Sequence, residues 1–147
     1  MGDQDEASEP FEDLAARLAV RIMDLANTAD DDVRAAGICE VFAPDYVLHS
    51  RRGGTVVGVD AYIERIAANL GGISGMHFTM DDFVAQGDRF ALRYHVTAPL
   101  GDREFRNEAL EINRVVEGQV VETWNYQDML SVLVQMGVIE NPFAPPS

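Results

Sequence analysis

A chain of 147 residues suits one domain with a single hydrophobic core, and its 47% hydrophobic and 24% charged residues are typical of a globular protein. The formal net charge of −14 repels phosphate groups, and no apolar run is long enough to span a bilayer, so neither a nucleic acid nor a membrane is an expected partner. All the basic residues are arginine, which excludes a lysine Schiff base. Because the N-terminus is acidic and polar, unlike a secretory signal, we expect a cytoplasmic protein.

The chain begins with two predicted helices. From Phe11 to Leu25 apolar residues recur at spacings of three and four, which is the pattern of an amphipathic helix. Residues 28–46 predict a second, shorter helix after an Asp-rich cap. It should stop near Pro44, because the residue before a proline avoids the helical region. Cys39 is the only cysteine, and its apolar neighbours predict a place in the core.

A short strand and a third helix follow. The stretch "DYVLHS" at 45–50 predicts the strand, and "RRGG" directly after it predicts a turn. Residues 58–72 predict the helix, with Asp60 as its N-cap and a glycine at its end. The order to this point is three helices, with one strand inserted between the second and the third.

In the second half of the chain the period changes to two, which predicts strands. They follow one another at hairpin spacing, at residues 77–86, 89–98, 104–115 and 119–127. Sequential hairpins make the sheet antiparallel and curved, and helices gathered before a run of strands indicate the α+β class. We therefore expect a sheet wrapped around the N-terminal helices with a central pocket between them.

The two ends of the chain differ in composition from the middle. We expect a flexible acidic N-terminus at residues 1–9, a single domain at 10–139 and a flexible Pro-rich tail at 140–147. A short last helix should begin after Asp128, which suits an N-cap, and run to about Met136.

The last hairpin decides which side chains share a face of the sheet. A two-residue type I′ turn would need a positive φ at Glu117, which a residue with a Cβ resists. A three-residue loop from Val116 to Gly118 avoids that strain, and we expect it here. The resulting register makes Glu111 and Asn125 diagonal neighbours on one face.

With this register, alternation divides the last three strands into an apolar and a polar face. The apolar face comprises Phe90, Leu92, Tyr94, Val96, Leu110, Ile112, Trp124 and Tyr126. The polar face comprises Arg93, His95, Glu111, Asn113, Thr123 and Asn125. Alternation alone leaves open whether the polar face meets water or lines a cavity.

Several stretches resemble a known family over most of the chain. They include "FAPDYVLHS", "GVDAYIERI" and, most specifically, "NRVVEGQVVETWNYQDMLSVLVQMG", with its Arg-x-x-x-Gly hairpin, a Trp and an Asp four residues later. These stretches resemble the SnoaL-like polyketide cyclase group of the nuclear-transport-factor-2-like superfamily. The resemblance implies a cone-like curved antiparallel sheet capped by helices, a deep apolar pocket and, often, a homodimer formed through the outer sheet face.

The resemblance also implies a chemistry. Cyclases of the group close a ring of a polyketide intermediate by aldol chemistry without a cofactor. The limonene epoxide hydrolases, which the chain resembles more distantly, use an Asp-Arg-Asp arrangement in the same pocket. We therefore expect no cofactor and a small apolar organic substrate. No histidine spacing typical of a metal site occurs, so no metal is expected.

Residue by residue, the resemblance implies that Arg93, His95, Glu111 and Asn125 point into the cavity. Asn125 takes the place of the aspartate that acts as acid/base in the cyclases, and an amide cannot take a proton from carbon. Our hypothesis is that His95 or Glu111 transfers the proton, while Arg93 holds an enolate or carbonyl oxygen and Asn125 donates a hydrogen bond to that oxygen. In the alternative, Arg93 only pairs with Glu111 across strands and His95 is a structural donor.

Further residues are candidates for substrate binding. Tyr46 and His49 lie in the predicted strand near the pocket mouth, and Asn113 and Thr123 lie on the polar face. The leading hypothesis is a cofactor-independent cyclase or isomerase acting by acid/base catalysis on an apolar, carbonyl-bearing natural-product intermediate. An epoxide hydrolase or epoxide-opening cyclase is the second hypothesis. A non-catalytic protein that binds a small molecule is the third.

Overall fold

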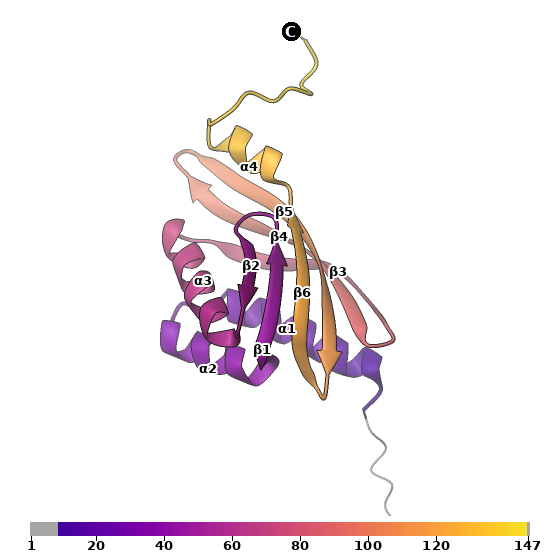
Figure 1. Cartoon of the computed structure of the whole chain (residues 1–147). Coiled ribbons are helices and arrows are strands. Elements are labelled where there is room, and N and C mark those ends of the chain that lie inside the picture. The colour runs from indigo at the N-terminus through magenta and orange to yellow at the C-terminus, as the bar shows by residue number, and fades with distance from the viewer. Residues whose placement is uncertain (1–8, 147) are drawn as a thin grey trace, which may run out of the picture.

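The structure of the protein is a computed structural model in which residues 9–146 are described. Helices and strands follow one another along these residues (Figure 1). In chain order they are α1 (Phe11–Ala26), α2 (Asp31–Val41), β1 (Phe42–Ser50), β2 (Gly54–Val57), α3 (Val59–Gly72), β3 (His77–Gln86), β4 (Arg89–Leu100), β5 (Arg103–Val116), β6 (Gln119–Gln127) and α4 (Met129–Gln135). Most of the segment predicted to be flexible at 1–9 lies outside the described residues. None of the described helices has the length and apolar character needed to cross a bilayer.

The first two helices are close to their predicted bounds. The buried side of α1 carries the apolar stripe, including Leu18, Ile22 and Leu25. The start of α2 is fixed by Asp30, whose side chain accepts a hydrogen bond from the backbone N–H of Val33 at 2.9 Å. The helix ends at residue 41 without a loop, and the chain passes directly into β1.

One prediction for α2 is wrong, because Cys39 is exposed. The helix turns Arg34 and Ile38 inward instead. The buried Arg34 guanidinium donates to the carbonyl oxygen of Thr28 at 2.7 Å and also bonds the Asp31 carboxylate. These bonds satisfy the buried charge, which allows an arginine to occupy the inner side of the helix.

The caps of the later helices differ in their agreement with prediction. Gly58, with φ of 93°, is the N-cap of α3, and Asp60 lies inside the first turn rather than at the cap. Asp128 caps α4 as predicted, because its side chain accepts a hydrogen bond from the backbone N–H of Ser131 at 3.0 Å.

The strands form one open sheet in the order β2-β1-β6-β5-β4-β3. Strands β3 to β6 make the predicted antiparallel run, but β1 lies parallel to β6, so the sheet is mixed. The edge strand β2 has only four residues and is not predicted from the sequence pattern. Its pairing with β1 places the "RRGG" turn at the tip of a short hairpin.

The predicted register of the β5–β6 hairpin is wrong. Its loop has two residues, Glu117 and Gly118, with φ of 51° and 80°, as a type I′ turn requires. A bulge at Val121 then shifts the pairing by one more residue, so that Glu111 lies directly opposite Asn125. Because the turn and the bulge each move the register by one residue, the two side chains still share a face.

The predicted sorting of β4 against β5 is also wrong. The Gly101–Asp102 loop places Leu92 opposite Glu111, on the inner face of the sheet, and turns Arg93 to the outer face. On β4 the inner side chains are therefore apolar, whereas on β5 and β6 many are polar. A loop one residue longer would have given the predicted arrangement.

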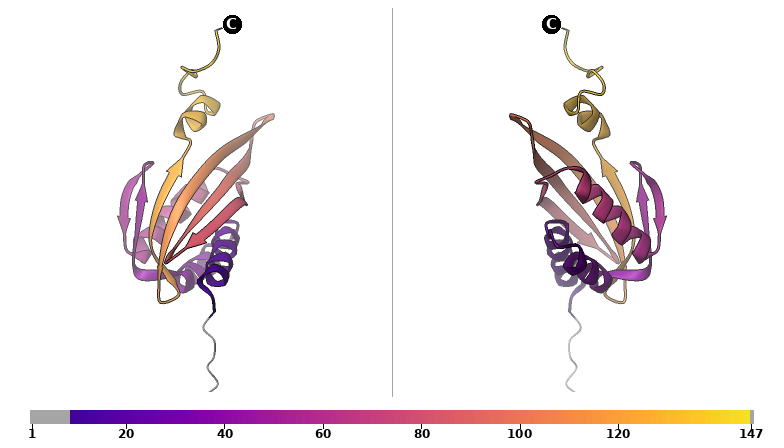
Figure 2. Two further views of the ribbon diagram at one scale, coloured as in Figure 1. Left: turned by 90° about the vertical axis from the view of Figure 1, so that its right-hand side faces the viewer. Right: turned by 90° about the vertical axis from the view of Figure 1, so that its left-hand side faces the viewer.

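Three of the helices cover the inner face of the curved sheet. Figure 2 shows α1 and α2 at one end of the strands, α3 along the inner face, and α4 beyond the opposite end. The core forms where α1 and α2 meet the sheet, and it includes Leu18, Ile22, Phe42, Phe90 and Leu92. Further along the strands the layers separate, and the polar inner residues face the space between the sheet and α3.

The positive φ of Glu117 gives a testable prediction for stability. Substitution Glu117→Asn should raise the free energy of unfolding by roughly 0.5–1 kcal/mol, because asparagine adopts the left-handed region more readily and Asn-Gly is a preferred type I′ pair. Urea unfolding of both proteins measures the change. An unchanged or lower stability would contradict the turn described here.

Candidate active site

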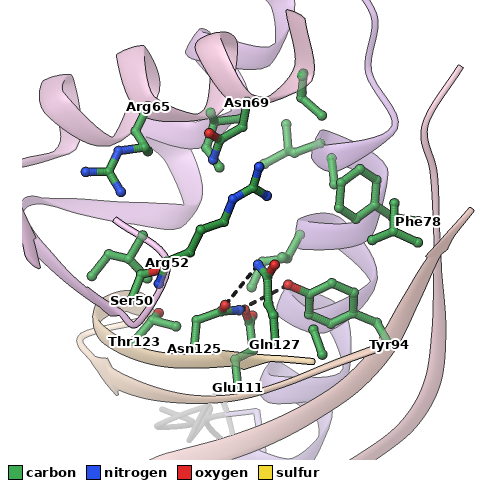
Figure 3. Close-up of a pocket in the computed structure, with 18 of the residues that line it drawn as sticks. Ser50, Arg52, Arg65, Asn69, Phe78, Tyr94, Glu111, Thr123, Asn125 and Gln127 are labelled. Atoms are coloured by element: carbon green, nitrogen blue, oxygen red, sulfur yellow. Dashed lines mark hydrogen bonds between the residues drawn. The ribbon is translucent and has the colours of Figure 1, made fainter. Parts of the chain in front are cut away.

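A cavity of about 300 Å³ lies between the inner face of the sheet and helices α1 and α3 (Figure 3). Much of its wall is aromatic or aliphatic. Phe42, Tyr46 and Tyr62 pack together with ring centroids 4.6–5.0 Å apart, and Phe78 lies 6.2 Å from Tyr94. Such an enclosure suits an apolar ligand of modest size.

Polar side chains of β5 and β6 form a continuous strip on the inner face. This polar strip comprises Asn107, Glu111, Asn113, Thr123, Asn125 and Gln127. All but Asn113 line the cavity. The strip places hydrogen-bonding groups on one side of a cavity whose other walls are largely apolar.

On one side of Glu111, amides of the polar strip donate to one another in a single direction. Asn107 Nδ2 donates to Gln127 Oε1 at 3.3 Å, and Gln127 Nε2 donates to Asn125 Oδ1 at 3.2 Å. Asn125 Nδ2 then donates to Glu111 Oε2 at 3.0 Å. Asn107 Oδ1 is the one buried side-chain oxygen or nitrogen without a partner among residues 9–146.

On the other side of Glu111, the strip continues below the cavity surface. Asn113 Nδ2 donates to Glu111 Oε1 at 3.2 Å. Asn113 Oδ1 in turn accepts a hydrogen bond from Thr123 Oγ1 at 2.6 Å. Both carboxylate oxygens are therefore held by neutral amides, and this fixes the orientation of the Glu111 side chain.

Glu111 is a buried carboxyl group that faces the cavity, with 9% of the residue exposed. Burial raises its pKa above the usual value, because the ionised form loses its hydration. The hydrogen bonds from Asn113 and Asn125 act in the opposite direction and keep ionisation accessible. A carboxyl group whose pKa is raised holds a proton more tightly than an ordinary carboxyl group, and it can both take and return one.

Tyr94 on β4 completes the polar part of the cavity. Its Oη accepts a second hydrogen bond from Asn125 Nδ2, at 3.1 Å. Burial, together with the nearby Glu111, raises the pKa of the Tyr94 hydroxyl well above its usual range, so the hydroxyl stays protonated. It keeps its own proton, which it can donate to an acceptor in the cavity.

The structure brings together only part of the predicted set. Of the predicted catalytic residues, Glu111 and Asn125 line the cavity, as do the predicted binding residues Tyr46 and Thr123. Asn113 is fully buried and does not line the cavity, but it is hydrogen-bonded to Glu111 and Thr123, which do.

Three predicted residues lie on the outer face instead. Arg93 is 3.9 Å from Asp82, and both side chains are more than half exposed. His95 Nδ1 is 2.8 Å from the Asp81 carboxylate, beside the bulge in β3. The prediction that Arg93 and His95 converge with Glu111 on one cavity is therefore wrong, because the β4–β5 loop has two residues.

His49 is the third residue on the outer face. Its Nε2 is 2.7 Å from Glu122 Oε2, and its ring stacks on Trp124 with centroids 5.4 Å apart. It does not line the cavity.

Sequence reasoning missed several residues that line the cavity. Asn107 and Gln127 continue the period of two that contains Glu111 and Asn125, so an extended alternation would have included them. Tyr94 could be found only from the β4–β5 register. Arg52, in the turn between β1 and β2, also lines the cavity, and its sequence context indicated no more than a turn.

Because burial raises the pKa of Glu111, stability should depend on pH through this residue. The unfolded chain has an ordinary carboxyl pKa near 4.5, so the folded state binds this proton more tightly. That contribution to stability is full below the unfolded pKa and is lost as the pH rises through the raised folded pKa. Relative to wild type, Glu111→Gln should therefore gain stability as the pH rises above about 4.5, the ordinary carboxyl pKa.

Urea unfolding at several pH values measures this difference. Glu108→Gln removes an exposed carboxyl on the outer side of the same strand and is the matched control for the loss of a carboxyl group. A stability difference for Glu111→Gln that does not grow with pH would contradict the raised pKa.

Comparison with known proteins supports the same architecture. The profile of the SnoaL-like domain family matches residues 19–123. No curated protein shows significant sequence similarity to the chain. Among solved structures, a protein from Jannaschia sp. CCS1 assigned as a SnoaL-like polyketide cyclase has a TM-score of 0.77 and 18% identity, over 96% of this chain and 99% of that one.

Two more solved structures share the fold and differ in their assigned activities. Wild-type IdmH from Streptomyces antibioticus, assigned as a polyketide cyclase, has a TM-score of 0.72 and 22% identity, over 84% of this chain and 99% of that one. AclR from Streptomyces galilaeus, assigned as a hydroxylase, has a TM-score of 0.67 and 26% identity, over 89% and 86%. The family match spans most of the chain, and the protein belongs to the SnoaL-like domain family.

Proposed function

We propose that the protein is a cofactor-independent cyclase or isomerase that acts by acid/base catalysis on an apolar, carbonyl-bearing small molecule. The observation that carries this proposal is a buried carboxyl group with a raised pKa, Glu111, which faces the cavity and is linked through Asn125 to the Tyr94 hydroxyl. A base and a hydrogen-bond donor held by the same amide are the two groups that enolisation requires.

The proposed reaction begins with a proton on the carbon next to a carbonyl group. The Glu111 carboxylate takes this proton, and the electrons of the C–H bond move onto the carbonyl oxygen as an enolate. The Tyr94 hydroxyl donates a hydrogen bond to that oxygen and stabilises its charge. No electron acceptor is needed, because the substrate is neither oxidised nor reduced.

The enolate then has two outcomes that match the two proposed activities. Attack of its carbon on a second carbonyl carbon of the same molecule forms a C–C bond and closes a ring. The proton from Glu111 passes to the new alkoxide. Return of the proton to a different carbon instead moves a double bond and gives isomerisation. Glu111 returns to its starting state in both cases.

Asn125 has a different role here from the one that the sequence suggested. Its amide nitrogen already donates to Glu111 and to Tyr94, so both of its N–H groups are used. It therefore positions the base and the donor relative to each other and does not itself contact the enolate oxygen. An amide suits this task, because an aspartate in its place would add a second negative charge beside Glu111.

Proton exchange on a simple ketone tests the chemistry without knowledge of the natural substrate. In D₂O the protein should accelerate loss of the α-proton signal of 1-tetralone, followed by NMR. Glu111→Gln should lower the catalysed rate by roughly 10²–10⁴-fold, because it removes the base. In wild type the rate should rise with pH through a pKa above 4.5, since burial raises the pKa of Glu111.

Glu108→Gln is the matched control for this experiment as well, because it makes the same change outside the cavity. It should leave the exchange rate within about twofold of wild type. Exchange that survives in Glu111→Gln would remove Glu111 as the base. Binding of the ketone without any exchange in wild type would favour a binding protein.

The assembly that we propose is a homodimer through the outer face of β5 and β6. Three apolar side chains on that face are 41–53% exposed in the single chain, namely Leu110, Ile112 and Tyr126. Arg51 lies 5.9 Å from the centre of the Tyr126 ring, at the border of this patch. A second copy would cover the apolar surface that the single chain leaves open to water.

Substitution Ile112→Asp should dissociate this dimer, because it places a charge in the apolar patch. Light scattering should then give a mass near 16.2 kDa for the variant and twice that value for wild type. Val20→Asp, on the exposed side of α1, is the control and should leave the mass unchanged. A wild-type mass near that of one chain would contradict the proposal.

A further inference from the structure

We propose that the substrate carries a carboxylate, and that Arg52 at the mouth of the cavity binds it. The acid end of the substrate would then lie at the turn between β1 and β2, and the reactive carbon at Glu111. The inference rests on the proposed function for the identity of the reacting end, but the binding of a carboxylate is testable without any reaction.

The first observation is the direction of the Arg52 side chain. Figure 3 shows it extending from the β1–β2 turn into the cavity, and in that view its guanidinium lies between Asn69 on α3 and Gln127 on β6. Among the described residues, no acidic side chain lies within salt-bridge distance of this guanidinium. Arg52 thus lines the cavity without an ion-pair partner among the described residues.

The second observation is that the turn carrying Arg52 is braced on both sides. The backbone N–H of Arg52 donates to Ser50 Oγ at 3.2 Å. From α3, Arg65 Nη2 donates to the carbonyl oxygen of Gly53 at 3.0 Å. A Cβ on Gly53 would lie only 2.4 Å from Arg65 Nη1, so the glycine lets the guanidinium pack directly on the turn.

The third observation is that Glu111, the carboxyl group in the cavity, is bound by amides and not by Arg52. Both oxygens of Glu111 accept hydrogen bonds from the amides of Asn113 and Asn125. No arginine is among the groups that lower the pKa of Glu111. An ion pair with Arg52 would stabilise the carboxylate and weaken it as a base. In this proposal Arg52 and Glu111 therefore contact different ends of the ligand.

A carboxylate is the anion that fits this arrangement best. The Arg52 guanidinium presents two parallel N–H groups, which match the two oxygens of a carboxylate. The other two arginines that line the cavity, Arg34 and Arg65, already donate to groups of the chain, whereas a phosphate group usually recruits several donors. The protein as a whole has a formal net charge of −14, which repels organic acids. Binding of a carboxylate would therefore depend on its local contact with Arg52.

The positions of Arg52 and Glu111 would then fix the direction of the substrate. Arg52 comes from the β1–β2 turn, and Glu111 lies at the middle of β5. An apolar keto acid that spans the two would keep its negative charge away from Glu111. Proton removal from the carbon beside the ketone would therefore not have to place two anions in contact.

Binding of matched probes tests the inference. Calorimetric titration should show that wild type binds 2-naphthoate at least tenfold more tightly than its neutral analogue 2-naphthamide. Arg52→Gln should abolish this preference and leave the affinity for the amide within about twofold. Arg51→Gln removes the same charge from the neighbouring position on the outer side of the turn, and it should keep the preference.

Three results would overturn the inference. They are equal affinity of wild type for the acid and the amide, equal loss of acid binding in the two arginine variants, and a parallel loss of both probes in Arg52→Gln. Glu111→Gln separates this inference from the proposed function, since the variant should lose proton exchange and keep the preference for the acid. Unfolding curves of each variant confirm that it is folded.

Discussion

The proposed chemistry depends on the hydrogen bonds that hold a buried carboxyl group between two amides. A carboxylate cannot be buried in an apolar cavity without partners, and a cationic partner would leave it a weak base. Neutral amides from Asn113 and Asn125 resolve both constraints, because they satisfy the oxygens of Glu111 without adding a charge. The remainder of the site is arranged around this carboxyl group.

This contact requires an exact pairing of β5 with β6. Glu111 and Asn125 lie directly opposite each other only because a two-residue turn and a bulge act together. The sequence reasoning chose a different loop and a different partner for each residue. It still placed both on one face, because two shifts of one residue cancel in the alternation of side chains. That part of the site was predictable from period alone.

The other parts of the site depend on information that a period of two does not contain. The positions of Tyr94 and Arg93 follow from the length of one loop, and the alternation within β4 is equally consistent with either result. Arg52 lies in a turn that Arg65 of α3 contacts at Gly53, and no local sequence pattern indicates this contact between a helix and a turn. The helices, the meander strands and the family resemblance could be predicted, since each depends on local pattern.

The amides beside Glu111 form a row of hydrogen bonds that all run in one direction. From Asn107 through Gln127 to Asn125, each amide donates one hydrogen bond to the next group, and the last of these bonds ends at the Glu111 carboxylate. Hydrogen bonds in such a row polarise one another, so each bond strengthens the donation from Asn125 to Glu111. Its far end is Asn107, a residue that lines the cavity and whose side-chain oxygen is buried without a partner among the described residues. Because the row ends at Glu111, a substitution at Asn107 would act on the proton affinity of Glu111 through the two amides between them.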